Sequence, residues 1–387
     1  MTIGGKMEYR RLGKTGIMVS EIGFGGEWLE RHEESESVAL IEYAYEKGIN
    51  IIDCWMADPK SRDIIGRAIR AHRDKWYVQG HIGSTYQNGQ YVRSRDLKCV
   101  CPAFEDLLRR LDTEYIDIGM IHYIDTVEDW DNAMNGEYIS YVHELHDNGI
   151  IKHIGISTHN PNIGKLAVET GFIEMIMFSI NPAFDMRPPT EDIDDLFIGY
   201  ENTGLSGIDA ERVELYRLCE ERNVGITVMK PFFGGRLFNK AQSPFGVTFT
   251  PAQLIHYCLT RPGVSSVMCG YDTKEQIEAA VHYEYATDDE KDYASVIASA
   301  PLHSYSGQCT YCGHCKPCPM DIDIAMVNKF YDLAKAQTKV PESVMEHYKS
   351  LGHTASECIG CGGCETRCPF GVAIADRMVE TTRLFGC

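Results

Sequence analysis

The sequence predicts an α/β protein that consists of a (β/α)8 TIM barrel followed by a small, cysteine-rich C-terminal helical domain. Short apolar runs alternate with amphipathic stretches eight times along most of the 387 residues. No G-x-G-x-x-G motif opens the first of these units, which disfavours the alternative of an open doubly wound sheet. The composition then changes past Pro301, and eight of the 15 cysteines lie in two short runs there. We therefore expect a barrel over residues 1–300 and a separate domain over residues 301–387.

The barrel prediction follows from the order of its elements. Residues 7–20 predict two short strands around the turn from Gly13 to Gly16. The runs that follow are apolar on both faces and separated by helical patterns, which is typical of a parallel sheet covered by helices. The predicted strands are 21–26, 49–55, 75–83, 115–123, 151–158, 174–181, 224–231 and 264–270. The predicted helices are 37–48, 61–72, 103–111, 138–149, 162–171, 210–223, 251–259 and 274–285.

Polar residues recur where the predicted barrel strands end. The carboxyl ends of barrel strands form the face that carries chemistry in this fold, while the strand interiors fill the core. The residues at these ends, in chain order, are Asp53, His81, His122, Ser157 with His159, Asn181, Lys230 and Gly270. Two long loops, residues 83–101 and 182–209, lie on the same face, and such loops in a compact domain are usually functional or disordered.

The cysteine runs predict iron-sulfur chemistry. CTYCGHCKPCP and CIGCGGCETRCP each contain three cysteines at two-residue spacing and a further cysteine followed by proline. A CxxCxxC loop with a remote Cys-Pro ligand is how cubane clusters are held. Structural zinc would favour two separated CxxC pairs, and disulfides would favour an exported chain. We therefore expect two 4Fe-4S clusters in a ferredoxin-like domain.

We expect the two ligand sets to cross, as in two-cluster ferredoxins. One set is Cys309, Cys312, Cys315 and Cys368, and the other is Cys358, Cys361, Cys364 and Cys318. Residues 322–337, 342–352 and 372–386 are helical by their apolar period. This domain has a small core of its own, so we expect it to depend on its clusters for stability.

The charge of the chain restricts its partners. A formal net charge of -19 argues against nucleic acid and anionic membrane surfaces, because either would need a basic face. The sequence has no apolar run of the length that a membrane helix needs, and its first residues lack the apolar core of a signal peptide. These features predict a cytoplasmic protein with a small-molecule substrate. They do not indicate an oligomeric state.

Several motifs make the chain resemble the aldo-keto reductases, in particular the branch with a C-terminal ferredoxin-like domain. The motifs are YRRLGKTGIMVSEIGFG at the start, GRAI after the second strand, IDIGMIHY at the fourth, IGIST at the fifth and INPAFD at the sixth. The resemblance implies a barrel with a nicotinamide cofactor across its mouth and a catalytic Asp, Tyr, Lys and His.

Two members of that tetrad are replaced here. Asp53 and His122 match the family aspartate and histidine, but Asp58 stands at the tyrosine position and His81 at the lysine position. A carboxylate with a reference pKa of about 3.9 acts as a base or a ligand unless burial raises that value, whereas an imidazole near 6.5 can act as an acid. We predict that Asp53, Asp58, His81 and His122 form the working site, with His122 polarising a substrate oxygen and His81 transferring the proton.

The resemblance also implies a set of cofactor contacts. Ser157 matches the family serine, but Thr158, Met177 and Asp272 depart from the family pattern, and Asp272 argues against a preference for NADPH. The loop with Gly234 and Gly235 offers flexible backbone on the phosphate side. The predicted cofactor-binding residues are Ser157, Asn181, Lys230, Gly234, Gly235, Gly270, Lys274 and Gln276.

The sequence thus predicts an iron-sulfur oxidoreductase that acts on a carbonyl, hydroxyl or unsaturated group of a small organic substrate. Electrons would pass through the two clusters, a nicotinamide or both, with a ferredoxin or another carrier as partner, and a flavin is left open. One alternative is a non-redox lyase or isomerase with an Asp/His site or a divalent metal at the mouth and structural clusters, because two histidines and a carboxylate suit zinc or iron. Another is an electron-transfer subunit whose barrel serves as a docking surface.

Overall fold

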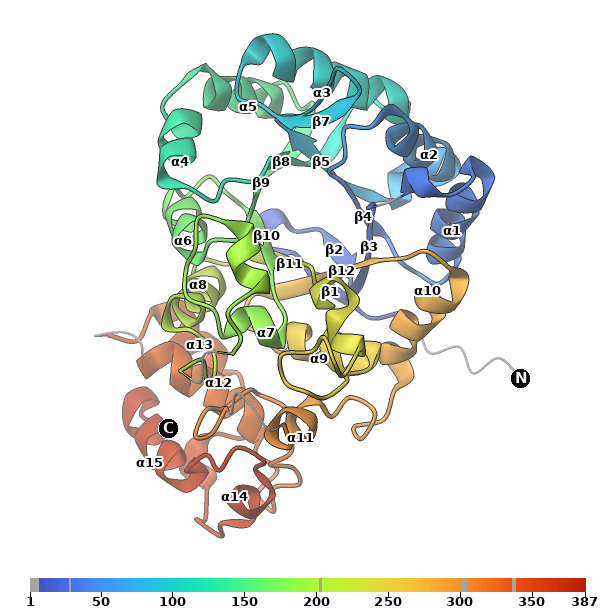
Figure 1. Cartoon of the computed structure of the whole chain (residues 1–387). Helices are drawn as coiled ribbons and strands as arrows, with labels where there is room; N and C mark the ends of the chain where they lie inside the picture. Colours follow the sequence, from blue (N-terminus) through green and yellow to red (C-terminus); the bar gives the residue numbers. More distant parts are fainter. Residues whose placement is uncertain (1–6, 28, 202–203, 301–304, 336–338) are drawn as a thin grey trace.

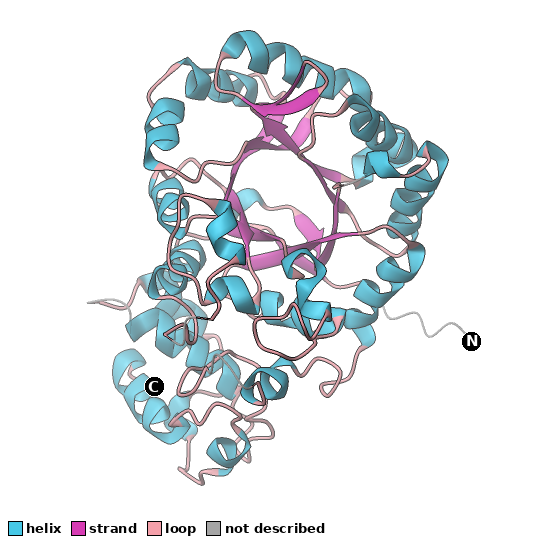
Figure 2. Cartoon of the chain, in the orientation of Figure 1, coloured by secondary structure: helices cyan, strands magenta, loops and turns pink. Residues whose placement is uncertain are grey.

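A computed structural model describes residues 7–27, 29–201, 204–300, 305–335 and 339–387. Eight parallel strands close into a barrel with helices around it, as predicted (Figure 2). Each barrel strand pairs with the next one along the chain, and the last pairs with the first. The barrel strands are β3 (Ile22–Gly25), β4 (Ile51–Cys54), β5 (Tyr77–Ile82), β8 (Ile116–Ile121), β9 (Ile151–Thr158), β10 (Met175–Ser179), β11 (Gly225–Met229) and β12 (Val264–Gly270).

Helices follow the strands where the apolar period predicts them, two further helices lie at residues 127–134 and 182–185, and polar caps begin most of the helices. Asp96 accepts a hydrogen bond from the backbone N–H of Lys98 at the start of α3, and Thr250 forms a capping box with Gln253 at α9. The helices of the barrel are α1 (Glu34–Glu46), α2 (Pro59–Ile69), α3 (Leu97–Leu111), α4 (Val127–Met134), α5 (Glu137–Asp147), α6 (Pro161–Glu169), α7 (Pro182–Asp185), α8 (Ala210–Glu221), α9 (Pro251–Leu259) and α10 (Lys274–Val281).

The N-terminal hairpin closes the bottom of the barrel. Strands β1 (Tyr9–Arg11) and β2 (Met18–Ser20) pair antiparallel, as predicted, and bring Leu12 and Val19 under a barrel interior filled largely by methionine and isoleucine side chains. Gly13 lies so close to β11 that a Cβ there would come within 2.2 Å of the Gly225 nitrogen. With this end closed, only the opposite end of the barrel can receive a substrate.

The first long loop is not irregular, because it contains a β-hairpin. Strands β6 (Ser84–Gln87) and β7 (Gln90–Arg93) pair antiparallel across a two-residue turn of Asn88 and Gly89, both with positive φ. This is the turn geometry that Asn-Gly favours in hairpins. The second long loop contains α7 and a short 3-10 segment, Ile193–Phe197. Both loops thus supply fixed structure beside the barrel mouth.

The C-terminal part packs against the outside of the barrel beside α8 and α11 (Tyr293–Ala298) (Figure 1). Lys329 forms an ion pair with Glu220 of α8, and the Arg261 guanidinium donates to the backbone carbonyl of Thr310. The helices of this part are α12 (Ile324–Lys335), α13 (Glu342–Lys349), α14 (Gly363–Arg367) and α15 (Ile374–Phe385). The predicted boundary at residue 301 lies outside the described residues. No helix in the described ranges is long and apolar enough to cross a membrane.

Candidate active site at the barrel mouth

Three of the four predicted catalytic residues are joined by hydrogen bonds at the ends of neighbouring strands. His81 Nε2 lies 2.9 Å from Asp53 Oδ1, and His81 Nδ1 lies 2.8 Å from His122 Nδ1. All three side chains are almost completely buried. Gln79 also donates to Asp53 Oδ1, at 3.0 Å. The aspartate therefore anchors a chain of imidazoles that crosses β4, β5 and β8.

Tyr91 from the β6–β7 hairpin extends this chain toward solvent. Its hydroxyl lies 2.5 Å from His122 Nε2, and the residue keeps partial exposure. Trp55 packs edge-on against the Tyr91 ring and lies parallel to the His122 ring. The hairpin thus brings a phenol and an aromatic wall to the histidine that matches the family histidine.

One placement of the protons makes all three contacts hydrogen bonds while both histidines are neutral. Tyr91 donates to His122 Nε2, His122 Nδ1 donates to His81 Nδ1, and His81 Nε2 donates to Asp53; these proton positions follow from the contact pattern. Burial and the neighbouring positive charges lower the pKa of His122 well below its ordinary value. Burial also raises the pKa of Tyr91. The resting chain is therefore a protonated phenol connected through two neutral imidazoles to a carboxylate.

Asp58, at the family tyrosine position, has a different role. It is the N-cap of α2, where its carboxylate accepts a hydrogen bond from the Ser61 backbone N–H at 3.1 Å. Among the described residues it makes no hydrogen bond with Asp53, His81 or His122. The structure therefore brings together three of the predicted catalytic residues and leaves Asp58 at the helix start.

A second buried network lies at the ends of β8, β9 and β11. His159 Nδ1 lies 2.8 Å from Asp125 Oδ2, and Lys230 Nζ lies 3.2 Å from His159 Nε2. Asp125 also accepts from the His159 backbone N–H and from the Thr158 hydroxyl. Burial lowers the pKa of His159, against the raising effect of Asp125. This aspartate thus fixes the tautomer of a neutral histidine that faces a lysine amine.

The predicted cofactor residues differ in how much of each side chain is free to bind a ligand. Asn181 is fully buried: its amide nitrogen donates to the Lys230 backbone carbonyl, and its oxygen caps α7. Gln276 accepts from the Asp272 backbone N–H, and the Lys274 ammonium lies over the Tyr43 ring. The others are Ser157, buried at the end of β9, Gly270, exposed at the end of β12, and Gly234 and Gly235, in a loop with positive φ.

The donor groups of the mouth are arranged to bind one another. Throughout the described ranges, no group of three or more His, Cys, Asp or Glu side chains has an arrangement suited to a single metal ion. His81 uses both ring nitrogens, one toward Asp53 and one toward His122. The mouth therefore has the geometry of a proton-transfer chain.

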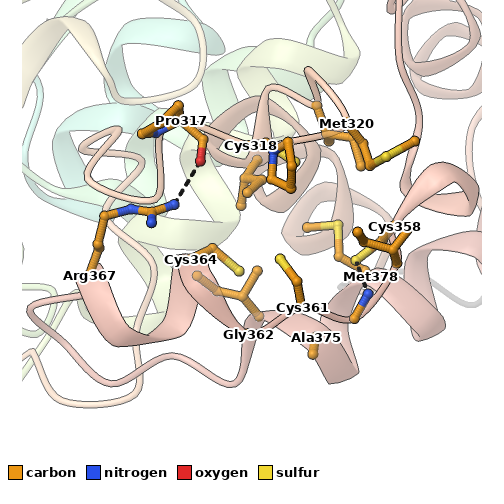
Figure 3. A pocket seen from close by; sticks show the side chains of 16 residues that line it. Pro317, Cys318, Met320, Cys358, Cys361, Gly362, Cys364, Arg367, Ala375 and Met378 are labelled. Atoms are coloured by element: carbon orange, nitrogen blue, oxygen red, sulfur yellow. Dashed lines mark hydrogen bonds between the residues drawn. The ribbon is translucent and has the colours of Figure 1, made fainter.

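One of the two predicted cluster ligand sets surrounds a common pocket. Its four cysteines line the same cavity together with apolar side chains such as Met320 and Met378 (Figure 3). The ligand set is Cys318, Cys358, Cys361 and Cys364. Cys318 comes from the first cysteine run and the others from the second, so the cavity has the crossed composition expected from the sequence. Thiols around an apolar hollow suit an iron-sulfur cluster.

The loops that carry the other predicted set also lie against each other. Arg367, next to Cys368, donates at 2.7 Å to the backbone carbonyl of Cys315 in the first run. The Gly307 backbone N–H donates to the Phe370 carbonyl at 2.7 Å. These bonds bring the loop of Cys368 to the run that contains Cys309, Cys312 and Cys315.

Two residues of the mouth were not among the sequence candidates. Tyr91 follows a Tyr-Gln-Asn-Gly-Gln stretch, and its Asn-Gly pair between tyrosines is a recognised hairpin signal that could have located it. Asp125 follows its strand by four residues in an ordinary loop, and no motif marks it. Its partner His159 is predicted from the sequence only as a residue at a strand end.

Comparisons with known proteins agree with the fold and with the two cysteine runs. Residues 21–253 match the sequence model of the aldo/keto reductase family, and residues 305–372 match that of the 4Fe-4S dicluster domain. The aldo-keto reductase AKR11C1 from Bacillus halodurans, in its holo form, superposes with a TM-score of 0.57 at 23% identity, over 77% of this chain and 98% of that one.

Curated relatives match smaller parts of the chain. The uncharacterized oxidoreductase YqkF of Bacillus subtilis (strain 168) is 31% identical over 186 residues, or 47% of this chain and 58% of the relative. The aldo-keto reductase YhdN of the same organism is 31% identical over 39% of this chain and 47% of the relative. The match thus spans about half the length of these relatives. L-galactose dehydrogenase of Arabidopsis thaliana is 24% identical over 71% of this chain and 88% of the relative. The chain belongs to the aldo/keto reductase family and carries a 4Fe-4S dicluster domain at its C-terminal end.

Proposed function

We propose that the protein interconverts a hydroxyl and a carbonyl group of a small organic substrate and moves the substrate proton along the chain Tyr91–His122–His81–Asp53. The observation that carries this proposal is the continuous hydrogen bonding of the four groups, from a partly exposed phenol to a buried carboxylate. Tyr91 supplies the phenol that the family tyrosine position, here Asp58, lacks. The general acid of this chain is then delivered by a hairpin and not by the loop after β4.

In the resting state the three hydrogen bonds all run from donor to acceptor in the direction from Tyr91 to Asp53. This direction suits removal of a proton from a substrate hydroxyl. As Tyr91 accepts that proton, its own moves to His122 Nε2, the His122 Nδ1 proton moves to His81, and the His81 Nε2 proton moves to Asp53. Carbonyl reduction uses the same chain in reverse, beginning with a protonated Asp53. In both directions the substrate oxygen exchanges its proton directly with Tyr91 only. Tyr91, His122 and His81 each give up one proton as they receive one, so these three groups stay uncharged.

We further propose that the family's nicotinamide binds at this mouth and that the C-terminal domain holds two 4Fe-4S clusters. The nicotinamide contacts would come from the predicted residues Ser157, Lys274 and Gln276. The cluster ligands would be the crossed sets, Cys309, Cys312, Cys315 and Cys368 on one side and Cys358, Cys361, Cys364 and Cys318 on the other. A bound nicotinamide would supply or accept hydride, and the clusters would exchange single electrons with a ferredoxin or another carrier.

The proposal is tested by removing the Tyr91 hydroxyl. Protein purified without oxygen is assayed on a panel of small aldehydes, ketones and alcohols with NADH, NADPH or reduced ferredoxin. Tyr91→Phe should lower kcat by about 10²–10⁴ and leave KM nearly unchanged, because proton transfer contributes that much in general acid–base catalysis. Tyr86→Phe is the matched control on the same hairpin and should keep wild-type turnover. Undiminished kcat in folded, iron-loaded Tyr91→Phe would refute the proton route.

A further inference from the structure

The network of Asp125, His159 and Lys230 has no part in the proton chain of Tyr91, although it opens on the same mouth. Lys230 is partly exposed and directly follows β11, and its amine has the His159 ring as its hydrogen-bonding partner, at 3.2 Å. Across the described residues it forms no ion pair within 4.0 Å. A lysine whose role is to bind a carboxylate of the fold would instead be paired. This amine faces a neutral nitrogen base and the opening of the barrel.

The backbone at Lys230 is held in an uncommon conformation. Its φ is +56°, in the left-handed region that a long side chain seldom adopts. The Asn181 amide donates to the Lys230 carbonyl at 2.9 Å and thereby holds this conformation. Residues kept in such conformations cluster at functional sites, because the surrounding structure must impose them. The fold therefore directs this particular side chain into the mouth.

The surroundings also favour the uncharged amine. Burial lowers the pKa of Lys230, and the negative charges of Glu27, Asp125 and Asp53 raise it only in part. His159 can take a proton from the ammonium through Nε2, since its Nδ1 proton is fixed by Asp125. The amine thus faces one base, His159, within hydrogen-bonding distance. The carboxylates around it act from farther away.

We propose that Lys230 is a nucleophile that captures small aldehydes or ketones as an imine, with His159 as its proton-transfer partner. The Lys230 nitrogen bonds to the carbonyl carbon, and its proton passes by way of His159 to the oxygen to give a carbinolamine. The carbinolamine nitrogen then gives its remaining proton to His159, which passes it to that hydroxyl, so that water leaves and a C=N bond remains. No oxidant or reductant is needed, so this step is independent of the hydride and cluster chemistry proposed above.

The experiment traps the imine in the complete, anaerobically purified protein. Acetaldehyde is added at pH 7 with sodium cyanoborohydride, and ethylated lysines are quantified by peptide mass spectrometry. Lys230 should be labelled at least about tenfold faster than the exposed Lys240, because an ordinary lysine with a pKa near 10.4 is almost fully protonated at this pH. Equal labelling of Lys230 and Lys240, or an unlabelled Lys230, would overturn the proposal.

Two variants distinguish loss of the base His159 or the nucleophile Lys230 from damage to the fold. His159→Gln keeps a hydrogen-bonding side chain but cannot carry a proton, so labelling of Lys230 should slow by about tenfold or more while that of Lys240 is unchanged. Lys230→Arg keeps the cation and should remove the fast labelling, with iron content and circular dichroism as checks of folding. Tyr91→Phe should be labelled like the wild type, so a failure of the proton route and a failure of imine capture give different results. Wild-type labelling rates in folded His159→Gln would exclude its role.

Discussion

Among single residues, Glu284 connects folding stability to pH. One of its carboxylate oxygens accepts from the Glu8 backbone N–H at 3.2 Å, and the other has no hydrogen-bond partner among the described residues. Burial and the nearby negative charge of Glu21 raise its pKa to about 7. The folded protein therefore binds a proton at this site between pH 4.5 and 7 more readily than the unfolded chain does, so this group reduces stability as pH rises through that range.

We expect Glu284→Gln to stabilise the protein above pH 7. The amide keeps an acceptor for Glu8 and removes the charge, which should increase the free energy of unfolding by about 1 kcal/mol at pH 8 after allowance for solvent screening, and change little at pH 4.5. Urea denaturation at the two pH values measures the difference.

The same substitution at Glu290 should act in the opposite direction. Hydrogen bonds from the Thr287 backbone and from His282 lower the pKa of Glu290 to about 2. Its ionised form is therefore favoured in the folded state, and that stability is present at neutral pH and lost as the pH falls through about 2. Glu290→Gln should destabilise the protein at pH 8, and a gain in stability there would contradict this assignment.

At the level of elements, the β6–β7 hairpin determines whether Tyr91 reaches His122. Gly89 has a φ of +78°, and a side chain there would meet no neighbour, so the backbone angle alone requires glycine. Gly89→Val should cost about 1 kcal/mol of unfolding free energy and should lower turnover while the iron content stays constant. Gly352→Ala is the control, because that glycine is in open space without positive φ and should change neither quantity. Wild-type turnover in Gly89→Val would show that the hairpin does not position the phenol.

The barrel elements could be predicted from sequence because their pattern is local. Each strand is a short apolar run and each helix has its own period, so the ends of β4, β5 and β8 directly indicate Asp53, His81 and His122. The cysteine runs are also recognised from local spacing, whereas the crossing of the two ligand sets is predicted from two-cluster ferredoxins; Cys318 lines one pocket with three cysteines of the second run.

The rest of the mouth depends on contacts between segments far apart in sequence. Tyr91 meets His122 only because a hairpin folds over the barrel rim, and Lys230 meets His159 across 71 positions of chain. Asp58 fits the family alignment, yet its local position before Pro59 makes it a helix cap. Alignment alone gives the position of a residue in the chain, but its partners are determined by the tertiary structure.

For the whole molecule, one buried path joins the cluster domain to the mouth. The Tyr305 hydroxyl donates to the Pro182 carbonyl at 2.6 Å and lies 3.4 Å from the Tyr257 hydroxyl. Pro182 begins α7, whose cap Asn181 holds the carbonyl of Lys230. Hydrogen-bonded groups therefore connect Tyr305, near the first cysteine run, with Lys230 at the rim of the barrel.

Removing the Tyr305 hydroxyl should weaken this junction. Tyr305→Phe leaves the buried Pro182 carbonyl without that donor, which should cost about 1–2 kcal/mol and lower the urea midpoint for loss of cluster absorbance. Tyr285→Phe, at an exposed tyrosine, should shift the midpoint little, because surface changes usually stay within about 0.5 kcal/mol. Equal midpoints for the two variants would show that the Tyr305 bond does not join the domains.

The series Tyr91–His122–His81–Asp53 has a consequence for the timing of turnover. Its three contacts span 2.5, 2.8 and 2.9 Å, and in the proposed proton route each reverses its donor whenever the substrate gains or loses a proton. If the shifts are concerted, the rate in mixtures of light and heavy water should fall along a curve, because several isotopic positions contribute to one barrier. An enzyme of this fold that relies on a single tyrosine would give a straight line. The solvent isotope experiment therefore counts the protons that move in one step, whereas a mutation only removes one of the groups.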